Sequence, residues 1–378
     1  MLIFMSMSVI KHQAEKLKQA SIIKPKGDLR MKQTMPLLSA TILGIIFLNE
    51  PLVAQTSEHP ANWPDWAYGL LSPLSEGDNI APPCPLNSRP IECGYVGQPV
   101  PDDGIKRTLP DTDLTFTRNE AYFGYGPADW YPNEHPIMPD VVAYGRESEG
   151  VQACALCHYP NGQGKMENGH VSGLPRDYIL QQLEAFIDGK RRSADRRKAN
   201  TNVMAMIASR LSDEEKIEVA EYYSSMNYRP MVRVIESDTA PQVRATTNGL
   251  MLPIPNATEI PLGQRIIEIP DDPEKTEMMR DPRGGFVAYV PLGSLEQGQE
   301  LVSTGSGKTI QCGICHGQDH MGVGLIPGIA GRTASYIMRQ LWDMKQGTRE
   351  SPLMAPVVAN LTADDMLYIS AYIASLPQ

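Results

Sequence analysis

The sequence predicts a mainly α-helical fold in which one small helical unit occurs twice. A five-residue motif, Cys-Ala-Leu-Cys-His at 154–158, returns as Cys-Gly-Ile-Cys-His at 312–316. The residues around the motif repeat with it, which is the signature of a duplicated structural module. An amphipathic helical pattern also follows each motif. We therefore expect two helical domains in tandem, at 139–227 and 291–378.

The two copies align in two registers. An offset of 158 residues aligns the motifs and the polar, apolar and glycine positions of the following helix, in the pairs Tyr178/Tyr336, Gln182/Gln340, Leu183/Leu341, Gly189/Gly347 and Arg191/Arg349. Beyond these pairs the offset falls to 150, so the first copy carries eight extra residues around 191–200. The shorter offset aligns Met204 with Met354 and Leu211 with Leu361.

Residues 1–54 are expected to be a leader and signal peptide. The apolar run 37–48 has the length of a secretory signal, and Leu-Val-Ala at 52–54 precedes a plausible cleavage site. A membrane anchor is the alternative, but the run is shorter than the ~20 residues that a spanning helix needs. Cleavage would place the mature chain in the periplasm.

Residues 55–138 are expected to form a long irregular extension. The segment is rich in Pro, Gly, Asp and aromatic residues and shows no helical periodicity, so we expect it to wrap a folded body through its aromatic side chains. Cys84 and Cys93 lie in this stretch. An oxidising compartment favours a disulfide between them, and ligation of a metal by one of their thiolates is the alternative.

The helices of the two domains have recognisable starts and ends. In the first copy we expect helices at 139–149 and 175–188, then a final helix that begins with the capping box Ser212-Asp-Glu-Glu215. In the second copy we expect helices at 292–303 and 335–346, then a final helix begun by Thr362-Ala-Asp-Asp365.

Between the two domains, residues 228–290 are expected to form a small β insert. Three short β-branched runs, at 232–236, 264–269 and 286–290, are separated by clusters of Pro, Gly and Asp. A simple linker between two tandem domains would be much shorter.

Each motif has the chemistry of covalent haem attachment. Two thiols three positions apart can each add to a haem vinyl group, and the next His then lies under the iron. A zinc knuckle would need a second Cys or Cys/His pair nearby, and a thioredoxin-type redox pair has no use for the His. We expect two covalently bound haem c groups, attached through Cys154, Cys157, Cys312 and Cys315, with His158 and His316 as iron ligands.

A methionine at the same place in both copies is the expected second ligand of each iron. Met204 stands seven residues before Leu211, as Met354 stands before Leu361. Methionine in a core is more often a gap-filler than a ligand, but the duplicated spacing favours Met204 and Met354. Met206 remains the alternative in the first copy.

The order of these features resembles class I cytochromes c. That order is C-x-x-C-H, a Gly-rich turn, a middle helix, then a Met loop leading into a helix that starts Leu-[Ser/Thr]-x-[Asp/Glu]. The tandem is similar to dihaem electron carriers of that group and covers 141–226 and 292–378. The resemblance implies a small helical fold around each haem, His/Met ligation of iron and one-electron transfer.

Charge narrows the choice of partner. The chain has 34 Lys/Arg and 44 Asp/Glu, a formal net charge of −10. Residues 1–54 hold seven Lys/Arg and three Asp/Glu, which leaves −14 without them. Nucleic acid and anionic lipid are therefore disfavoured, and a basic protein surface is favoured. The basic run 191–198 predicts a solvated loop, with a docking patch or a clamp for haem propionates as the alternative.

Two irons with both axial positions filled favour electron transfer over catalysis. The sequence therefore predicts an exported dihaem carrier, or the cytochrome subunit of a periplasmic dehydrogenase complex, more readily than an enzyme in its own right. Its partners would be redox proteins: a donor dehydrogenase and an acceptor oxidase or reductase. The alternative is a catalytic dihaem oxidoreductase, similar to thiosulfate dehydrogenases or peroxidases, which needs one iron that is open or held by a labile ligand.

Overall fold

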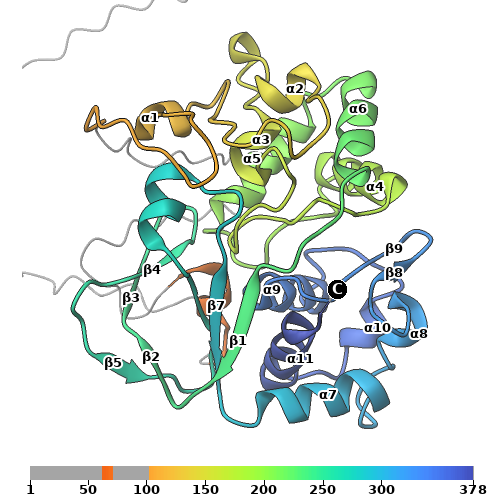
Figure 1. The fold of residues 1–378 in the computed structure, drawn as a ribbon. Coiled ribbons are helices and arrows are strands. Elements are labelled where there is room, and N and C mark those ends of the chain that lie inside the picture. Colours follow the sequence, from red (N-terminus) through yellow and green to blue (C-terminus); the bar gives the residue numbers. More distant parts are fainter. Residues whose placement is uncertain (1–61, 71–101, 378) are drawn as a thin grey trace, which may run out of the picture. The chain divides into compact units, whose positions relative to one another are not determined.

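A computed structural model describes residues 62–70 and 102–377, which belong to a compact unit comprising His59–Gln378 (Figure 1). The leader expected at 1–54 lies outside the described residues, as do Cys84, Cys93 and the disulfide expected between them. The extension expected at 55–138 is described in part.

The first helical region surrounds the first motif. Its helices are α2 (Asp140–Ala143), the 3₁₀ helix Glu147–Glu149, α3 (Cys154–His158), α4 (Arg176–Ile187), α5 (Ala199–Ala208) and α6 (Asp213–Ser224). Helix α4 packs against α5 and α6, and Leu183, Ala205 and Tyr223 lie in the core between them. The single helix expected at 139–149 is instead two short pieces, because Gly145 between them adopts a left-handed φ of 63°.

The capping boxes set the starts of the two final helices, as the sequence predicts. The Ser212 hydroxyl accepts a bond from the Glu215 backbone N–H (3.2 Å), and the Glu215 carboxylate accepts one from the Ser212 N–H (2.8 Å). Thr362 and Asp365 make the same reciprocal pair. Both predicted capping boxes are confirmed.

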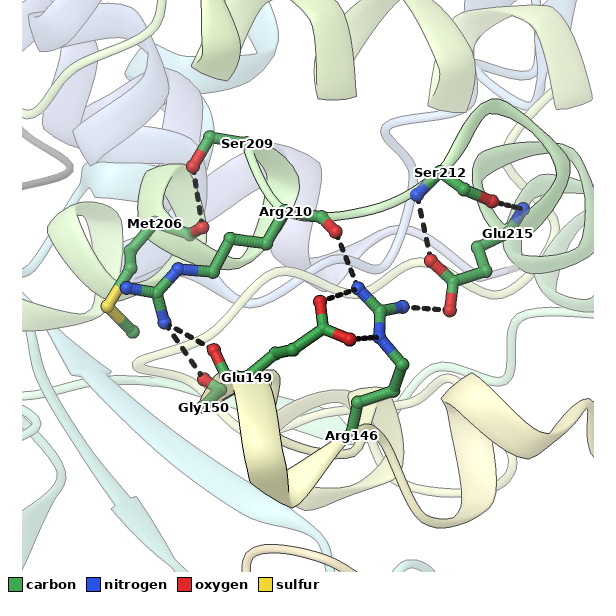
Figure 2. Close-up of polar contacts among 8 residues, drawn as sticks. All are labelled: Arg146, Glu149, Gly150, Met206, Ser209, Arg210, Ser212 and Glu215. Atoms are coloured by element: carbon green, nitrogen blue, oxygen red, sulfur yellow. Dashed lines mark hydrogen bonds and ion pairs between the residues drawn. The ribbon is translucent and has the colours of Figure 1, made fainter.

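Polar contacts join residues 146–150, which precede the first motif, to the residues at the start of α6 (Figure 2). The Arg146 guanidinium donates to the carboxylates of Glu149 and Glu215 and to the carbonyl oxygen of Arg210 (2.7 Å). Arg210 in turn donates to the carbonyl oxygen of Glu149 (2.8 Å). The chain just before the first motif is thereby held to the turn between α5 and α6.

The second helical region contains the second motif. Its elements are α7 (Ser294–Thr304), α8 (Gly313–His316), the short hairpin β8 (Gly322–Val323) and β9 (Ile326–Pro327), α9 (Ala334–Lys345), α10 (Ala355–Val358) and α11 (Ala363–Ser375). Helix α11 packs on α7 and α9. Gly298 lets α7 approach α11 closely, because a Cβ at this position would lie 2.1 Å from the Tyr368 carbonyl oxygen of α11.

Strands occupy the segment between the two helical regions. They are β1 (Val232–Glu236), β2 (Thr239–Pro241), β3 (Val243–Ala245), β4 (Met251–Pro253), β5 (Glu259–Pro261), β6 (Ile267–Pro270) and β7 (Phe286–Val290). Strand β7 lies between β1, which is parallel to it, and β6, which is antiparallel. The pairs β2–β5 and β3–β4 are separate antiparallel ladders. The β-branched runs expected at 232–236 and 286–290 coincide with β1 and β7.

The described part of the extension packs through aromatic side chains. It contains the 3₁₀ helix Asp65–Tyr68 and α1 (Arg118–Ala121). The Trp63 ring lies edge-on to Trp342 of α9 with centroids 5.4 Å apart, and the Tyr68 hydroxyl donates to the Asp343 carboxylate (2.7 Å). The residues near Trp63 are therefore held against the second helical region.

The two helical regions meet along segments that are equivalent in the repeat. An antiparallel bridge pairs Arg191 with Arg349, which occupy the same position in the two copies. Two backbone hydrogen bonds flank the bridge, from Arg192 N–H to the Thr348 carbonyl oxygen (2.8 Å) and from Glu350 N–H to the Lys190 carbonyl oxygen (2.7 Å). The offset of 158 exchanges one of these bonds for the other. The contact therefore has local twofold pseudo-symmetry.

Candidate haem sites

The two thiols of the first motif lie one turn apart on α3 and face a cavity. Burial raises the pKa of Cys154 to about 12 and also raises the pKa of Cys157. Redox-active dithiols have the opposite property, because thiolate formation is what makes them reactive. The pair therefore lacks the lowered thiol pKa of a redox-active dithiol.

The His158 ring is oriented by a backbone carbonyl group. Its Nδ1 lies 2.8 Å from the Gly169 carbonyl oxygen, and because a carbonyl can only accept, Nδ1 carries the proton and donates. Burial lowers the pKa of His158, which keeps the ring neutral. Its Nε2 is thus an unprotonated nitrogen available as a metal ligand, the tautomer that a carbonyl partner typically fixes.

The second motif repeats this geometry. His316 Nδ1 lies 2.8 Å from the carbonyl oxygen of Pro327, which stands 158 residues after Gly169. The same ring nitrogen is therefore held by the equivalent carbonyl group in both copies, although glycine stands in one and proline in the other.

The cavity beside the first motif fits a haem. It has a volume of about 830 Å³ and is lined by Cys154, Cys157 and His158 together with Met204 and apolar side chains of α4 and α5. Two thiols, an imidazole and a thioether around an apolar space form the donor set of a c-type haem site. The residues present therefore fit the group that the motif predicts.

Met204 and Met206 differ in their position relative to this cavity. Both are half-buried against the first core, but only Met204 is among the residues that line the space shared with His158. The surroundings differ from the expected Met loop, because Met204 lies inside α5. Alanines at 199, 205 and 208 favour helix through the segment, and the expectation of a loop there is wrong.

The second site is more open to solvent. Met354 stands immediately before α10 and packs, half-buried, on the same core as Cys312. Cys315 is exposed, and so is Ile314 between the two cysteines. The second donor set thus contains the same residue types as the first but lies near the surface.

A polar network that the sequence did not predict lies where the two regions meet. It consists of three pairs of repeat-equivalent side chains: Tyr178/Tyr336, Gln182/Gln340 and Arg191/Arg349. The Arg349 guanidinium donates to the Tyr178 hydroxyl (2.7 Å), and Arg191 donates to the Tyr336 hydroxyl (3.3 Å). Each arginine also donates to the glutamine of its own copy and of the other copy. The sequence feature that could have indicated this network is the alignment of the same three polar residues in the two copies.

The basic run 191–198 is not a solvated loop, so that expectation is wrong. Arg191 belongs to the network between the two regions. Lys198 is 4% exposed and donates to the Asn248 carbonyl oxygen (2.7 Å), while Arg197 pairs with Asp195. The insertion in the first copy is therefore folded into the body of the protein. Arg191 and Lys198 also line the cavity.

Within 62–70 and 102–377, every helix is too short or too polar to cross a membrane.

The chain is similar to known c-type cytochromes. The family model that matches is Cytochrome c, over residues 142–227. The thiosulfate dehydrogenase electron acceptor of Stutzerimonas stutzeri is 33% identical over 244 residues, which cover 63% of this chain and 85% of that protein. The protein of the same description from Thiomonas intermedia is 24% identical, covering 60% of this chain and 79% of its own length. Cytochrome c4 of Pseudomonas aeruginosa is 35% identical over 33% of this chain and 61% of its own.

The similarity to the Stutzerimonas protein extends over most of that protein and well beyond a single motif. The motif chemistry, the oriented histidine and the cavity are consistent with it. The chain belongs to the cytochrome c family, whose members carry covalently bound haem c and transfer electrons.

Proposed function

We propose that this protein is a dihaem electron carrier with one haem c in each helical region, 139–227 and 291–378. The main support is that His158 and His316 are held by equivalent carbonyl groups at the same distance of 2.8 Å. An imidazole oriented in this way twice over is what two separate iron ligands require. Residues 228–290 then act as the β insert between two haem domains.

In each domain the chain holds its haem at four points. Cys154 and Cys157 would hold the first haem through thioether bonds, with His158 and Met204 as ligands of its iron. Cys312, Cys315, His316 and Met354 would do the same in the second. A bound haem c would supply a one-electron Fe(III)/Fe(II) couple, and ligation by a His and a Met of the chain would leave its iron no open position for a substrate. Electron transfer is therefore favoured over the alternative, a catalytic dihaem oxidoreductase.

The donor we propose is a dehydrogenase that oxidises thiosulfate. Two relatives are described as electron acceptors of thiosulfate dehydrogenase, and the first is similar over 85% of its length. The chain would be exported to the periplasm through the signal at 1–54, accept electrons there as a free carrier or as a subunit of the dehydrogenase, and pass them to an oxidase or reductase.

The proposed port for the donor is a set of exposed apolar side chains around the second motif, here called the apolar rim. It comprises Ile310, Ile314, Met321, Val323, Leu325 and Leu353, which are 43–73% exposed. The β8–β9 hairpin that carries part of it packs beside α8, which carries the motif. An exposed apolar patch of this kind marks an interaction site. At the equivalent place in the first copy, the chain itself covers the surface: Tyr122 of the extension lies over Lys165.

Mass spectrometry and electron paramagnetic resonance test the dihaem function. We expect the exported protein to begin near Gln55 and to carry two added haem groups, each ferric iron being low-spin with a His/Met signature. One added haem, or a high-spin or thiolate-ligated iron, would instead favour the catalytic alternative.

Stopped-flow reduction by a thiosulfate dehydrogenase, with thiosulfate as the electron source, tests the port. We expect Ile314→Ser and Val323→Ser each to lower the second-order rate constant by roughly five- to tenfold, because truncating an apolar anchor costs about 1 kcal/mol or more of association energy. Ile105→Ser is the matched control, since Ile105 is 55% exposed and lies outside the apolar rim. An equal effect of all three substitutions would show that the donor docks elsewhere.

A further inference from the structure

Arg280, between the π-helix Lys275–Met279 and β7, is buried beside the first motif. Its side chain belongs to a residue that is only 2% exposed, and its backbone adopts a left-handed φ of 54°. Non-glycine residues are uncommon in this conformation, so the surrounding structure must hold it there. Trp130 of the extension contributes by donating from Nε1 to the Met279 carbonyl oxygen (2.7 Å).

The Arg280 guanidinium binds the helix that carries the first motif. It donates to the carbonyl oxygens of Ala155 (2.9 Å) and Leu156, the two residues between Cys154 and Cys157. It also donates to the carbonyl oxygen of Ala121 at the end of α1 (2.9 Å). One side chain of the insert thus joins the extension to the two central residues of the attachment motif.

Two aromatic rings enclose the same cation. The guanidinium carbon lies 5.4 Å from the ring centroid of Tyr122 and 5.0 Å from that of Tyr159. Rings at this distance attract a cation and exclude water from it. The contacts leave the guanidinium in a dry environment, where its charge acts over a longer range than it would in water.

The charge of Arg280 has no counter-ion among the described residues. Nearby acids have partners of their own: Glu167 pairs with Lys165 (2.7 Å), and Glu277 pairs with Arg244 (3.2 Å). No salt bridge within 102–377 joins Arg280 to a carboxylate. Among the described residues, no carboxylate therefore offsets the charge of Arg280 beside the first motif.

The second motif has no equivalent of this arrangement. The counterparts of Ala155 and Leu156 are Gly313 and Ile314, and Ile314 is 65% exposed. The lysine before that motif, Lys308, is neutralised by Asp365 at 2.7 Å. The two haem sites therefore differ in local charge as well as in exposure.

We propose that Arg280 is a positioning residue that holds the first motif helix in place and, through its unpaired charge, raises the reduction potential of the first haem above that of the second. The proposal rests on the dihaem function proposed above. Reduction adds one electron to ferric iron and lowers the net charge of the site by one, so a nearby cation favours the ferrous form. Burial in an apolar cavity acts in the same direction. An electron that enters at the exposed second site would then move to the first.

The test is a potentiometric titration of the holoprotein with its two haem waves resolved. We expect Arg280→Gln to lower the reduction equilibrium constant of the first haem about tenfold, equivalent to 59 mV for one electron, and to leave the second wave in place. Arg280→Lys keeps the charge without the fork of donors. Arg280→Lys should keep the reduction equilibrium constant of the first haem within about threefold of the wild-type value. It should nevertheless accelerate amide hydrogen exchange at Cys157 and His158.

The control variant is Arg265→Gln. Arg265 also belongs to the insert and donates to backbone carbonyl oxygens, but these are those of Leu262 and Pro261 and not those of the first motif helix. We expect both waves to stay in place in this variant. An unmoved first wave in Arg280→Gln, or equal shifts of both waves, would overturn the proposal.

Two further measurements separate loss of the haem from loss of the charge. If Arg280→Gln cannot be recovered with its first haem, Arg280→Lys is titrated instead. A tenfold change in the reduction equilibrium constant of its first haem, despite the retained charge, would overturn the proposal. Haem is counted in the wild-type protein first. A wild-type chain with fewer than two haems would reject the dihaem function itself, whereas an immobile first wave in a two-haem protein rejects only the role of Arg280.

Discussion

The two motifs share the pattern C-x-x-C-H, yet one is covered and the other exposed. In the first copy, Lys165 and Glu167 form an ion pair in which each residue is at most 6% exposed. Their counterparts under the offset of 158 are Val323 and Leu325, which are 60% and 62% exposed. Charged residues are thus inside and apolar ones outside, the reverse of what solvation alone favours.

The reversal shows what the extension and the insert do. They cover the first site, and the two opposite charges buried there, Lys165 and Glu167, pair with each other. The second site keeps an uncovered apolar surface that another protein can bury. One repeated unit is therefore covered in its first copy and exposed in its second, with the difference made by the segments outside the repeat.

Removing the attachment thiols should separate the two sites most strongly. Cys154→Ala/Cys157→Ala is expected to lose one haem and the fold of the first region, because a space of about 830 Å³ among its helices would be left unfilled. Cys312→Ala/Cys315→Ala should lose the other haem but keep the first region folded. Haem content and limited proteolysis report the outcomes, and equal resistance to protease in the two variants would contradict the comparison.

Removing the axial methionines should show the difference in access. Met204→Ala and Met354→Ala should each lower the potential of their own haem and open its iron to carbon monoxide. We expect binding to be about tenfold faster in Met354→Ala, because the second site is exposed and needs less opening of the chain. Laser photolysis of the carbonyl form measures the rate. No binding and an unchanged potential in Met354→Ala would show that this methionine is not the ligand.

The network between the two regions should contribute measurably to stability. Arg191→Leu or Arg349→Leu removes hydrogen bonds to half-buried tyrosine and glutamine groups, which costs about 0.5–1.5 kcal/mol for each bond lost. The double variant should lose less than the sum, because the two arginines share acceptors. Urea unfolding measures the change in the free energy of unfolding. Arg176→Leu, an exposed arginine of α4, is the control and should stay within about 0.5 kcal/mol.

The smallest expected effect concerns pH and the contact of the extension with α9. Burial raises the pKa of Asp343 to about 6, although Tyr68 and the Ala194 N–H donate to its carboxylate. The folded pKa is above the unfolded value near 4, so Asp343 makes the protein less stable as pH rises from about 4 to 6. Asp343→Asn should remove this slope, at most about 1.4 kcal/mol per pH unit. Urea unfolding at several pH values measures it, and identical slopes in both proteins would contradict the assignment.

The sequence predicted the features that depend on local chemistry. The capping boxes at Ser212 and Thr362 begin α6 and α11, and the runs of Val and Ile at 232–236 and 286–290 coincide with strands. The duplicated spacing also favoured Met204, which lines the cavity, over Met206. Capping, periodicity and repeat register act over a few residues, so they can be recognised in the chain itself.

Features that depend on tertiary contacts could not be predicted in this way. Nothing in the run around Arg280 indicates that its guanidinium reaches Leu156, 124 residues earlier. The basic run at 191–198 has the composition of a solvated loop, yet Arg191 and Lys198 find acceptors in distant segments. The covering of the first site and the exposure of the second likewise depend on how the extension and insert fold back on the repeat.

The most direct test of the central claim is mass spectrometry of proteolytic peptides from the purified, exported protein. Two haem-bearing peptides are expected, one containing Cys154 and Cys157 and the other Cys312 and Cys315, at one haem per peptide in every chain. A haem on only one of these peptides, or free thiols at either motif, would contradict the account of two haem domains in one chain.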